Sequence, residues 1–312
     1  MSEVITALAG GVGAARLLRG LVSVVPPSEI TAVVNTGDDM ELHGLHISPD
    51  LDTVTYTLAG VIDPDTGWGR VGESWRTMDE LARYGGQTWF RLGDLDLATH
   101  LYRTQRRAEG APLSAISAEI AAAWGVDVRL VPMSDDPVRT VLRVAGQGEV
   151  AFQDYFVRQR HDVTVEAVRF AGVDRAAPAP GVLDALASAD IVVVCPSNPI
   201  VSIGPILAVP GVRAAMESRR ERSVAVSPII AGAAVKGPAD RLLRELGHDA
   251  SVVGVARLYA PLASVLVIDG ADADLADAVR DQGITPVVTE TLMTSPEAAA
   301  NLARVVIDAV AG

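Results

Sequence analysis

The N-terminal segment places a strand, a glycine turn and a helix in close succession. Val4 to Ala9 is a short apolar run that ends at Gly10-Gly11-Val12-Gly13, and a helical pattern follows through Leu17, Leu18 and Leu21. A second apolar run begins at Ile30. A strand, a helix and a second strand in succession are typical of a βαβ unit, in which the helix is the crossover between two parallel strands of one sheet. The segment therefore predicts an α/β protein with a mostly parallel sheet.

The glycine turn also indicates an anion site. Free backbone N–H groups and the positive end of a helix dipole favour a phosphate at such a turn. However, Gly11-x-Gly13-x-x-Arg16 lacks the third glycine of a dinucleotide fingerprint and the Gly-Lys-Ser/Thr ending of a Walker loop. The turn therefore favours a phosphate or nucleotide, and a tight turn without a ligand is the other interpretation. The missing third glycine disfavours a nicotinamide dehydrogenase.

A dense set of polar side chains follows the second strand, Ile30 to Val34. Ligands of open α/β sheets bind at the carboxyl ends of the strands, where these side chains begin. The stretch is therefore a candidate metal and substrate platform, although a solvated acidic loop is the plain alternative. The two histidines do not favour zinc, since no Cys is nearby and their spacing is not i, i+4. The polar residues are Asn35, Asp38, Asp39, Glu41, His43, His46, Asp50 and Asp52.

A second polar strand end follows Ala189 to Cys195, a continuous run typical of a buried parallel strand. It leads into Pro196-Ser197-Asn198-Pro199 and then to Ser202 and Gly204. The two prolines fix φ on both sides of Ser197 and Asn198, which is unusual for a mere connection. A third polar end, Thr289 to Thr294, precedes a final helix that Ser295 is expected to cap.

Residues of about 60–126 differ in character from the rest of the chain. Trp68, Trp75 and Trp89 are three of its four tryptophans, and helical patterns alternate with glycine turns. We expect a largely helical insertion within one α/β domain spanning 1–312. Packing is the favoured interpretation of its aromatic residues, and a role in a ligand site is the alternative. The segments expected here are a helix capped by Asp52 or Thr53 and running to about Ala59, and helices at Asp94–Arg107 and Leu113–Trp124.

Two residues of this insertion bear on function. Arg91 precedes a turn and could face a pocket, whereas His100 is interpreted as a half-buried helix residue. Asp94 or Asp96 is explained by helix capping. Further elements are expected as strands at Val128–Pro132, Val138–Val144, Glu149–Gln153, Val163–Phe170, Ser223–Ile230, Ala263–Ile268 and Thr285–Val288, with a helix at Pro238–Leu246.

Charge and cysteine content exclude several classes of protein. The net charge is −13 and the pI near 4.8, which argues against nucleic-acid or anionic-membrane binding. Cys195 is alone, so no intramolecular disulfide framework exists and a reducing compartment fits. The N-terminal apolar run is too short for a signal peptide, and no run of about 18 apolar residues appears. A cytoplasmic protein without a membrane span is expected.

The motifs together resemble one family, the 2-phospho-L-lactate transferases, which include the bacterial phosphoenolpyruvate transferases and serve coenzyme F420 biosynthesis. The resemblance runs from Ala9 to Pro296. It is most specific in PSNPxxSIGPIL and SPDLDT. The motifs, in the family's order, are GGVGAARLLRGL, VVNTGDD, ISPDLDTVTYTLAG, LGDLDLATH, MSDDPV, PSNPIVSIGPIL, VSPIIAG and ETLMTSPE.

The resemblance implies a Rossmann-like fold with a helical insertion and a Mg²⁺-dependent reaction. A guanylyl-activated phospho-acid passes its phosphate to the ribityl hydroxyl of the deazaflavin Fo (7,8-didemethyl-8-hydroxy-5-deazariboflavin), and GMP leaves. The resemblance also implies a homodimer, as in other members of the family. Asp52 and Arg91 would contact Fo, and Asp38 would ligate the metal beside Asp50 and Asp52, so that Asp38 and Asp52 are the candidate catalytic residues. The guanine-nucleotide site would comprise Gly11, Gly13, Ser197, Asn198, Ser202 and Gly204.

Two questions stay open at this level. A nucleotide-sugar-binding regulatory protein of the gluconeogenesis-factor type would share the fold, although SPDLDT and the basic residue before LGD are not expected there. The transferred acid is also undecided. Phospholactate, phosphoenolpyruvate and 3-phosphoglycerate differ by a methyl, methylene or hydroxymethyl group, which a pocket distinguishes by only a few kcal/mol.

Overall fold

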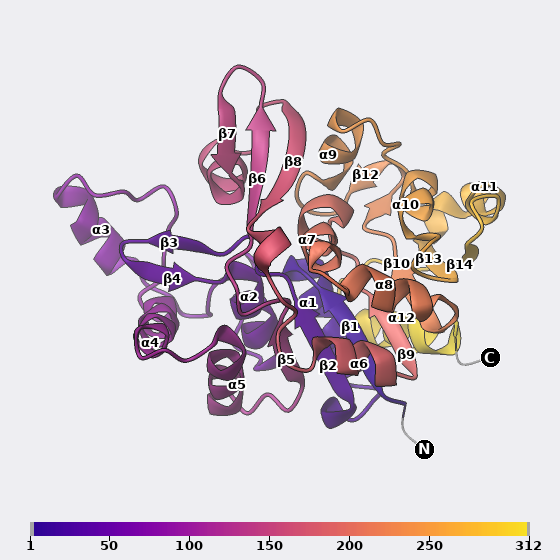
Figure 1. Cartoon of the computed structure of the whole chain (residues 1–312), viewed down its shortest axis with the longest axis horizontal. Coiled ribbons are helices and arrows are strands. Elements are labelled where there is room, and N and C mark those ends of the chain that lie inside the picture. Colours follow the sequence, from indigo (N-terminus) through magenta and orange to yellow (C-terminus); the bar gives the residue numbers. More distant parts are fainter. Residues whose placement is uncertain (1–2, 311–312) are drawn as a thin grey trace.

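The computed structural model describes residues 3–310 and is built on a seven-stranded sheet in which every pair of neighbouring strands is parallel (Figure 1). The strand order is β14-β13-β10-β9-β1-β2-β5. This confirms the α/β fold expected from the first βαβ segment. The strands are β1 (Ile5–Ala9), β2 (Ile30–Val34), β5 (Arg129–Pro132), β9 (Ile191–Val194), β10 (Ser223–Val226), β13 (Val265–Asp269) and β14 (Thr285–Thr289).

The register aligns the strand ends that carry the polar loops. β1 lies between β2 and β9, with Ala9 opposite Val34 and Leu8 opposite Val194. The glycine turn, the acidic loop and the Pro196 turn therefore start side by side at one edge of the sheet. Sequence spacing alone does not place them together, because β9 is far from β1 along the chain.

Helices cover both faces of the sheet, and alternate strand residues supply the two cores. On one face α1 and α12 pack together with α2 and α5, while α6 to α10 cover the other face. Figure 1 shows α12 returning beneath β1 near the C-terminal end. The helices are α1 (Gly11–Leu21), α2 (Pro49–Leu58), α3 (Arg76–Arg83), α4 (Asp96–Ala108), α5 (Leu113–Ala123), α6 (Val182–Ser188), α7 (Gly204–Ala208), α8 (Val212–Ser218), α9 (Ala239–Glu245), α10 (Val252–Tyr259), α11 (Ala276–Arg280) and α12 (Pro296–Asp308).

The chain between β2 and β5 carries a small hairpin, β3 (Met40–Leu42) with β4 (Leu45–Ile47), and then α2 to α5. One expectation here is wrong: α2 begins at Pro49, so Asp52 and Thr53 lie inside the helix and do not cap it. Proline is favoured at the first helical position, and carboxylates in the first turn suit the positive end of the helix dipole. The SPDLDT motif is therefore a helix start with Asp50 and Asp52 in its first turn.

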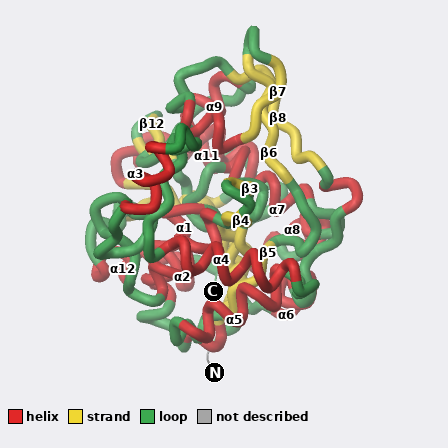
Figure 2. Tube along the Cα trace, turned by 90° about the vertical axis from the view of Figure 1, so that its left-hand side faces the viewer, coloured by secondary structure: helices red, strands yellow, loops and turns green. Residues whose placement is uncertain are grey.

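Two other strand expectations change when the sheets form. The strands expected after Pro137 build a separate antiparallel sheet of β7 (Gly148–Ala151), β6 (Arg139–Val144) and β8 (Val165–Ala171), which projects from the body in both ribbon views (Figures 1 and 2). The single strand expected at Ser223–Ile230 stops at Val226, and β11 (Ile229–Ile230) pairs instead with β12 (Ala233–Ala234). As expected, Ser295 caps α12, through a bond from the Ala298 N–H to its hydroxyl.

Within residues 3–310, no single helix is long and apolar enough to cross a membrane. A bent pair, Pro199–Ala208 and Val212–Ser218, meets a criterion of length and composition only, with an angle of 97° between its parts. Apolar side chains of this pair belong to the core on one face of the sheet.

Candidate active site

A cavity of about 640 Å³ lies at the aligned carboxyl ends of the strands. One side is an acidic wall, formed by Asp38, Asp50, Asp52, Asp96 and His100. A second part of the lining is a glycine wall, formed by the start of α1 and the Pro196 turn together with Arg16 and Lys236. It meets the acidic wall where Gly10 and Gly11 lie beside Asp50. Apolar side chains close the ends, among them Trp68 and Phe90 from the insertion and Phe152 and Phe156 beside β7.

Asp38 and Asp50 form one part of the acidic wall that suits a cation, and Asp52, Asp96 and His100 form another, with ligand atoms within 4.8 Å of one another. Asp38 is 7% exposed and Asp50 8% exposed. The Asn35 amide donates to Asp50 Oδ2 at 2.9 Å, whereas Asp38 Oδ1 is buried without a hydrogen-bond partner. Burial, together with the charges of Asp50 and Asp39, raises the pKa of Asp38, and burial raises the pKa of Asp50 to about 6. Two adjacent carboxyls of this kind require a proton or a cation.

Asp52 is held by a different partner, which the sequence did not reveal. Arg103 of α4 is 2% exposed and donates from both terminal nitrogens to the two carboxylate oxygens of Asp52, with Nη1 3.1 Å from Oδ2. Burial raises the pKa of Asp52, and the charge of Arg103 opposes that rise. Because a guanidinium already occupies its oxygens, Asp52 suits substrate contact better than metal ligation.

The rest of the acidic wall comes from α4, whose histidine is 1% exposed and not half-buried as expected. His100 Nδ1 lies 3.3 Å from Arg103 Nη1, so it accepts a hydrogen bond and the proton is assigned to Nε2. That nitrogen lies 3.2 Å from Asp96 Oδ2, and the Tyr56 hydroxyl donates to Asp96 Oδ1 at 2.6 Å. Asp96 therefore serves the cavity, while the start of α4 is capped by Glu73, which accepts from the Leu95 and Asp96 N–H groups.

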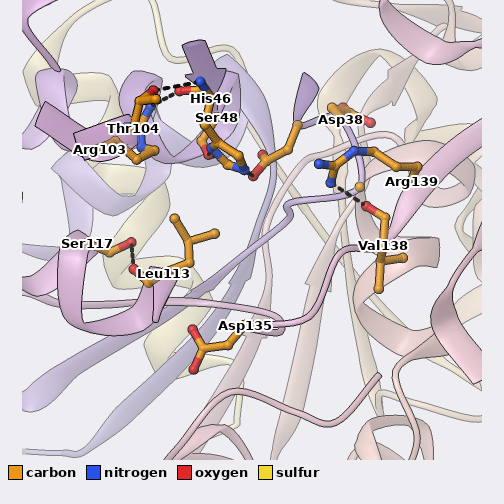
Figure 3. Close-up of polar contacts among 12 residues, drawn as sticks. Asp38, His46, Ser48, Arg103, Thr104, Leu113, Ser117, Asp135, Val138 and Arg139 are labelled. Atoms are coloured by element: carbon orange, nitrogen blue, oxygen red, sulfur yellow. Dashed lines mark hydrogen bonds and ion pairs between the residues drawn. The ribbon is translucent and has the colours of Figure 1, made fainter. Parts of the chain in front are cut away.

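Asp39 is directed away from the cavity. The Ser48 hydroxyl donates to it at 2.7 Å, His46 Nε2 is 3.6 Å away, and burial raises its pKa to about 7. Figure 3 shows His46 and Ser48 on one side of this region and Arg139 of β6 entering from the other. His43 is exposed in the turn between β3 and β4 while His46 is buried, so the two histidines do not form one site.

The glycine wall depends on close backbone approach. Gly11 has φ +71° and lies beside Asp50, so it requires glycine. A Cβ on Gly13 would lie 2.3 Å from the Pro196 carbonyl oxygen, so this glycine lets α1 pack against the turn after β9. Ser197 joins the same two segments, since its hydroxyl donates to the Gly10 carbonyl at 2.8 Å.

The other expected nucleotide residues divide into two groups. Asn198 and Ser202 line the cavity. The side-chain oxygen Oδ1 of Asn198 accepts from the Ile200 N–H, and the buried Nδ2 of Asn198 has no partner. Gly204 is not among the lining residues. A Cβ there would lie 3.1 Å from Phe170, so Gly204 serves helix packing.

Two cations face the start of α1, and the sequence analysis assigned them no role. Arg16 belongs to α1, and Lys236, the single lysine of the chain, donates from Nζ to the Thr66 carbonyl at 2.7 Å. Burial and the charge of Arg16 lower the pKa of Lys236. α1 has no acidic residue in its first turn. This side of the cavity is therefore suited to an anion.

Arg91 lies at the cavity's edge with the aromatic residues of the insertion. Its guanidinium carbon is 4.6 Å from the centre of the Trp75 ring, and Asp79 lies 3.8 Å away. Trp68, which is 45% exposed, packs edge-on against Trp75. Trp75 and Trp89 thus serve packing, against Trp68 and Phe90 respectively, whereas Trp68 both packs and lines the cavity.

A parallel α/β fold with an acidic wall and an anion-suited wall around one cavity defines an enzyme of nucleotide or phosphate chemistry. Comparison with known proteins gives the family. The family model described as 2-phospho-L-lactate transferase CofD matches residues 5–309, so the chain belongs to this family. It is therefore a transferase of coenzyme F420 biosynthesis.

Similar proteins span nearly the whole chain. The phosphoenolpyruvate transferase of Kitasatospora aureofaciens is 48% identical over 96% of this chain and 95% of its own length. The protein of the same name from Thermobifida fusca is 45% identical, with 97% of each chain covered. Among solved structures, that of a Bacillus halodurans protein of the UPF0052 family aligns with a TM-score of 0.63 at 15% identity, covering 98% of this chain and 99% of that one. This last likeness concerns the fold alone.

Proposed function

We propose that this enzyme transfers the phospho-acid group of a guanylyl-activated donor to the terminal ribityl hydroxyl of Fo and releases GMP. The hydroxyl oxygen forms the new bond to phosphorus, the bond to GMP breaks, and the hydroxyl proton passes to a base. Relatives that are 42–48% identical are named phosphoenolpyruvate transferases, which supports enolpyruvyl phosphate as the transferred group.

The observation that carries the proposal is the unpartnered, buried oxygen of Asp38 beside Asp50, in the cavity that Arg16 and Lys236 also line. Asp38 and Asp50 would hold Mg²⁺, whose preferred ligands are carboxylate oxygens and water. When bound, the ion would offset the negative charge that develops on the phosphate oxygens. Asp52 is left out of the metal set because Arg103 occupies both its oxygens.

Each wall has a task in this scheme. The N–H groups at the start of α1 and the two cations hold the donor's phosphates, and Asn198 offers a buried amide donor to the nucleotide. Fo, a flat ring with a polar tail, suits the edge formed by Trp68, Phe90 and Arg91. Its terminal hydroxyl then meets Asp52, which orients it or accepts its proton, a role that requires a contact of about 3 Å.

The experiment is mass spectrometry of the products formed from Fo with Mg²⁺ and each of three donors, guanylylated phosphoenolpyruvate, 2-phospholactate and 3-phosphoglycerate. We expect GMP and the dehydro product from the enolpyruvyl donor in excess over the other two. No product from any donor, together with binding of a UDP-sugar, would instead favour the regulatory class. A homodimer and a cytoplasmic location stay predictions from the family resemblance.

A further inference from the structure

Arg103 is a completely buried arginine next to the acidic wall. It is 2% exposed and belongs to α4, while the residue it contacts most closely, Asp52, belongs to α2. Removing a guanidinium from water is strongly unfavourable unless its N–H groups are satisfied. The burial of such a side chain beside a ligand cavity therefore indicates a role at that cavity.

The guanidinium is fixed from three directions. Besides the two bonds to Asp52, Nη1 lies 3.3 Å from the His46 carbonyl oxygen of β4 and 3.3 Å from His100 Nδ1. The planar fork of arginine matches the two oxygens of a carboxylate, so it sets the plane of that carboxylate as well as its position. Asp52 is thereby fixed relative to β4 and α4 together.

Arg103 itself does not line the cavity, whereas Asp52 does. Any effect of Arg103 on a bound substrate must therefore pass through another residue. Arg106, another arginine of α4, has no such link to the cavity. Its partners, Glu119 at 2.8 Å and Glu109, do not line the cavity.

We propose that Arg103 is a positioning residue of the transfer reaction, which holds the Asp52 carboxylate in one orientation toward the acceptor hydroxyl. The inference rests on the proposed function. The effect is geometric: without the fork, the carboxylate can rotate and its oxygen leaves the place where the hydroxyl must lie. A misplacement of about 1 Å at a reacting group lowers turnover about 100-fold.

The test is a double-mutant cycle in the full-length protein with Fo, donor and Mg²⁺. Arg103→Met should lower kcat about 100-fold and leave the GDP affinity, measured by calorimetry, unchanged. Asp52→Asn and the double variant Asp52→Asn/Arg103→Met should have the same kcat, because Arg103 acts only through Asp52. The double variant removes both buried charges, so it has no unpaired buried charge that would destabilise the fold.

Three further measurements complete the design. Arg103→Lys should be intermediate, since an ammonium cannot fork, and guanidinium added to Arg103→Ala should restore part of the turnover. Arg106→Met is the control and should match the parent. If Arg103→Met lowers kcat equally in the Asp52→Asn background, or if GDP affinity falls with it, the inference is overturned. A parent protein without turnover would instead refute the proposed function, and the inference with it.

Discussion

The two walls of the cavity are held in place by different kinds of contact. The acidic wall consists of buried charges that constrain one another: Arg103 forks onto Asp52, and His100 lies between Arg103 and Asp96. The glycine wall is ordered by backbone contact, where Gly13 lets α1 approach the Pro196 carbonyl, and its charges, Arg16 and Lys236, are exposed. Among the described residues that line the cavity, Asp38 of the acidic wall is the one with a buried carboxylate oxygen that has no partner.

This difference indicates where substitutions affect chemistry and where they affect structure. A buried, unpaired carboxyl has a raised pKa and gains most from a cation, so the acidic wall should determine turnover. A glycine whose Cβ would overlap a carbonyl should determine stability. Exposed cations act through a screened field and should contribute least.

The largest effect is expected at Asp38. Asp38→Asn should lower turnover about 100-fold or more, because a metal ligand contributes several kcal/mol of charge stabilisation. The melting temperature should stay the same or rise, since the amide avoids a buried carboxylate. Steady-state rates across a Mg²⁺ titration, with thermal unfolding, would measure both.

Asp39→Asn is the matched control, since Asp39 is equally buried but bonded to Ser48 outside the cavity. It should leave the Mg²⁺ requirement unchanged. Equal loss of activity in both variants would remove the distinction between a metal ligand and a structural carboxylate.

The next effect tests the glycine wall. Gly13→Ala should lower the free energy of unfolding by about 1–3 kcal/mol, the usual cost of overpacking, because its Cβ would overlap the Pro196 carbonyl. Gly270→Ala is the control, as its Cβ would have an ordinary contact of 3.5 Å with Glu290. Urea unfolding measures both. A Gly13→Ala protein of parental stability and weaker GDP binding would show that phosphate approach, and not packing, requires this glycine.

A smaller effect is expected for the cations. Lys236→Met should weaken GDP binding by about 5-fold at low salt and less at high salt, as expected for a screened pair worth about 1 kcal/mol. Arg19→Met, which removes an exposed cation of α1 that does not line the cavity, should leave it unchanged. Calorimetry of GDP binding at two ionic strengths would measure both variants. A salt-independent loss would contradict the electrostatic role.

The smallest effect is expected for Arg91. Arg91→Ala should raise the Michaelis constant for Fo about 3-fold to 10-fold with little change in kcat, because an exposed side chain contributes uniform binding. Fluorescence titration of Fo would measure the same loss in affinity. Unchanged affinity would place Fo away from the insertion's aromatic edge.

The sequence predicted the sheet and the three polar strand ends because both are local signals. A β-branched run such as Ala189 to Cys195 buries both faces, and a change to polar residues marks where the strand leaves the core. The start of α2 was predicted wrongly. Pro49 occupies the first helical position, but the polar residues around it resemble those of a loop.

The sequence by itself determined the fold class, the family motifs and the loops from which the cavity would be built. Only the tertiary structure decided which charges meet. Arg103 looks like any surface arginine in a stretch rich in arginines, and its partner Asp52 lies 51 residues earlier. Likewise, the role of Gly13 depends on the Pro196 carbonyl, which arrives with a distant strand. Burial and pairing are properties of contacts between segments, so no local pattern of residue types can specify them.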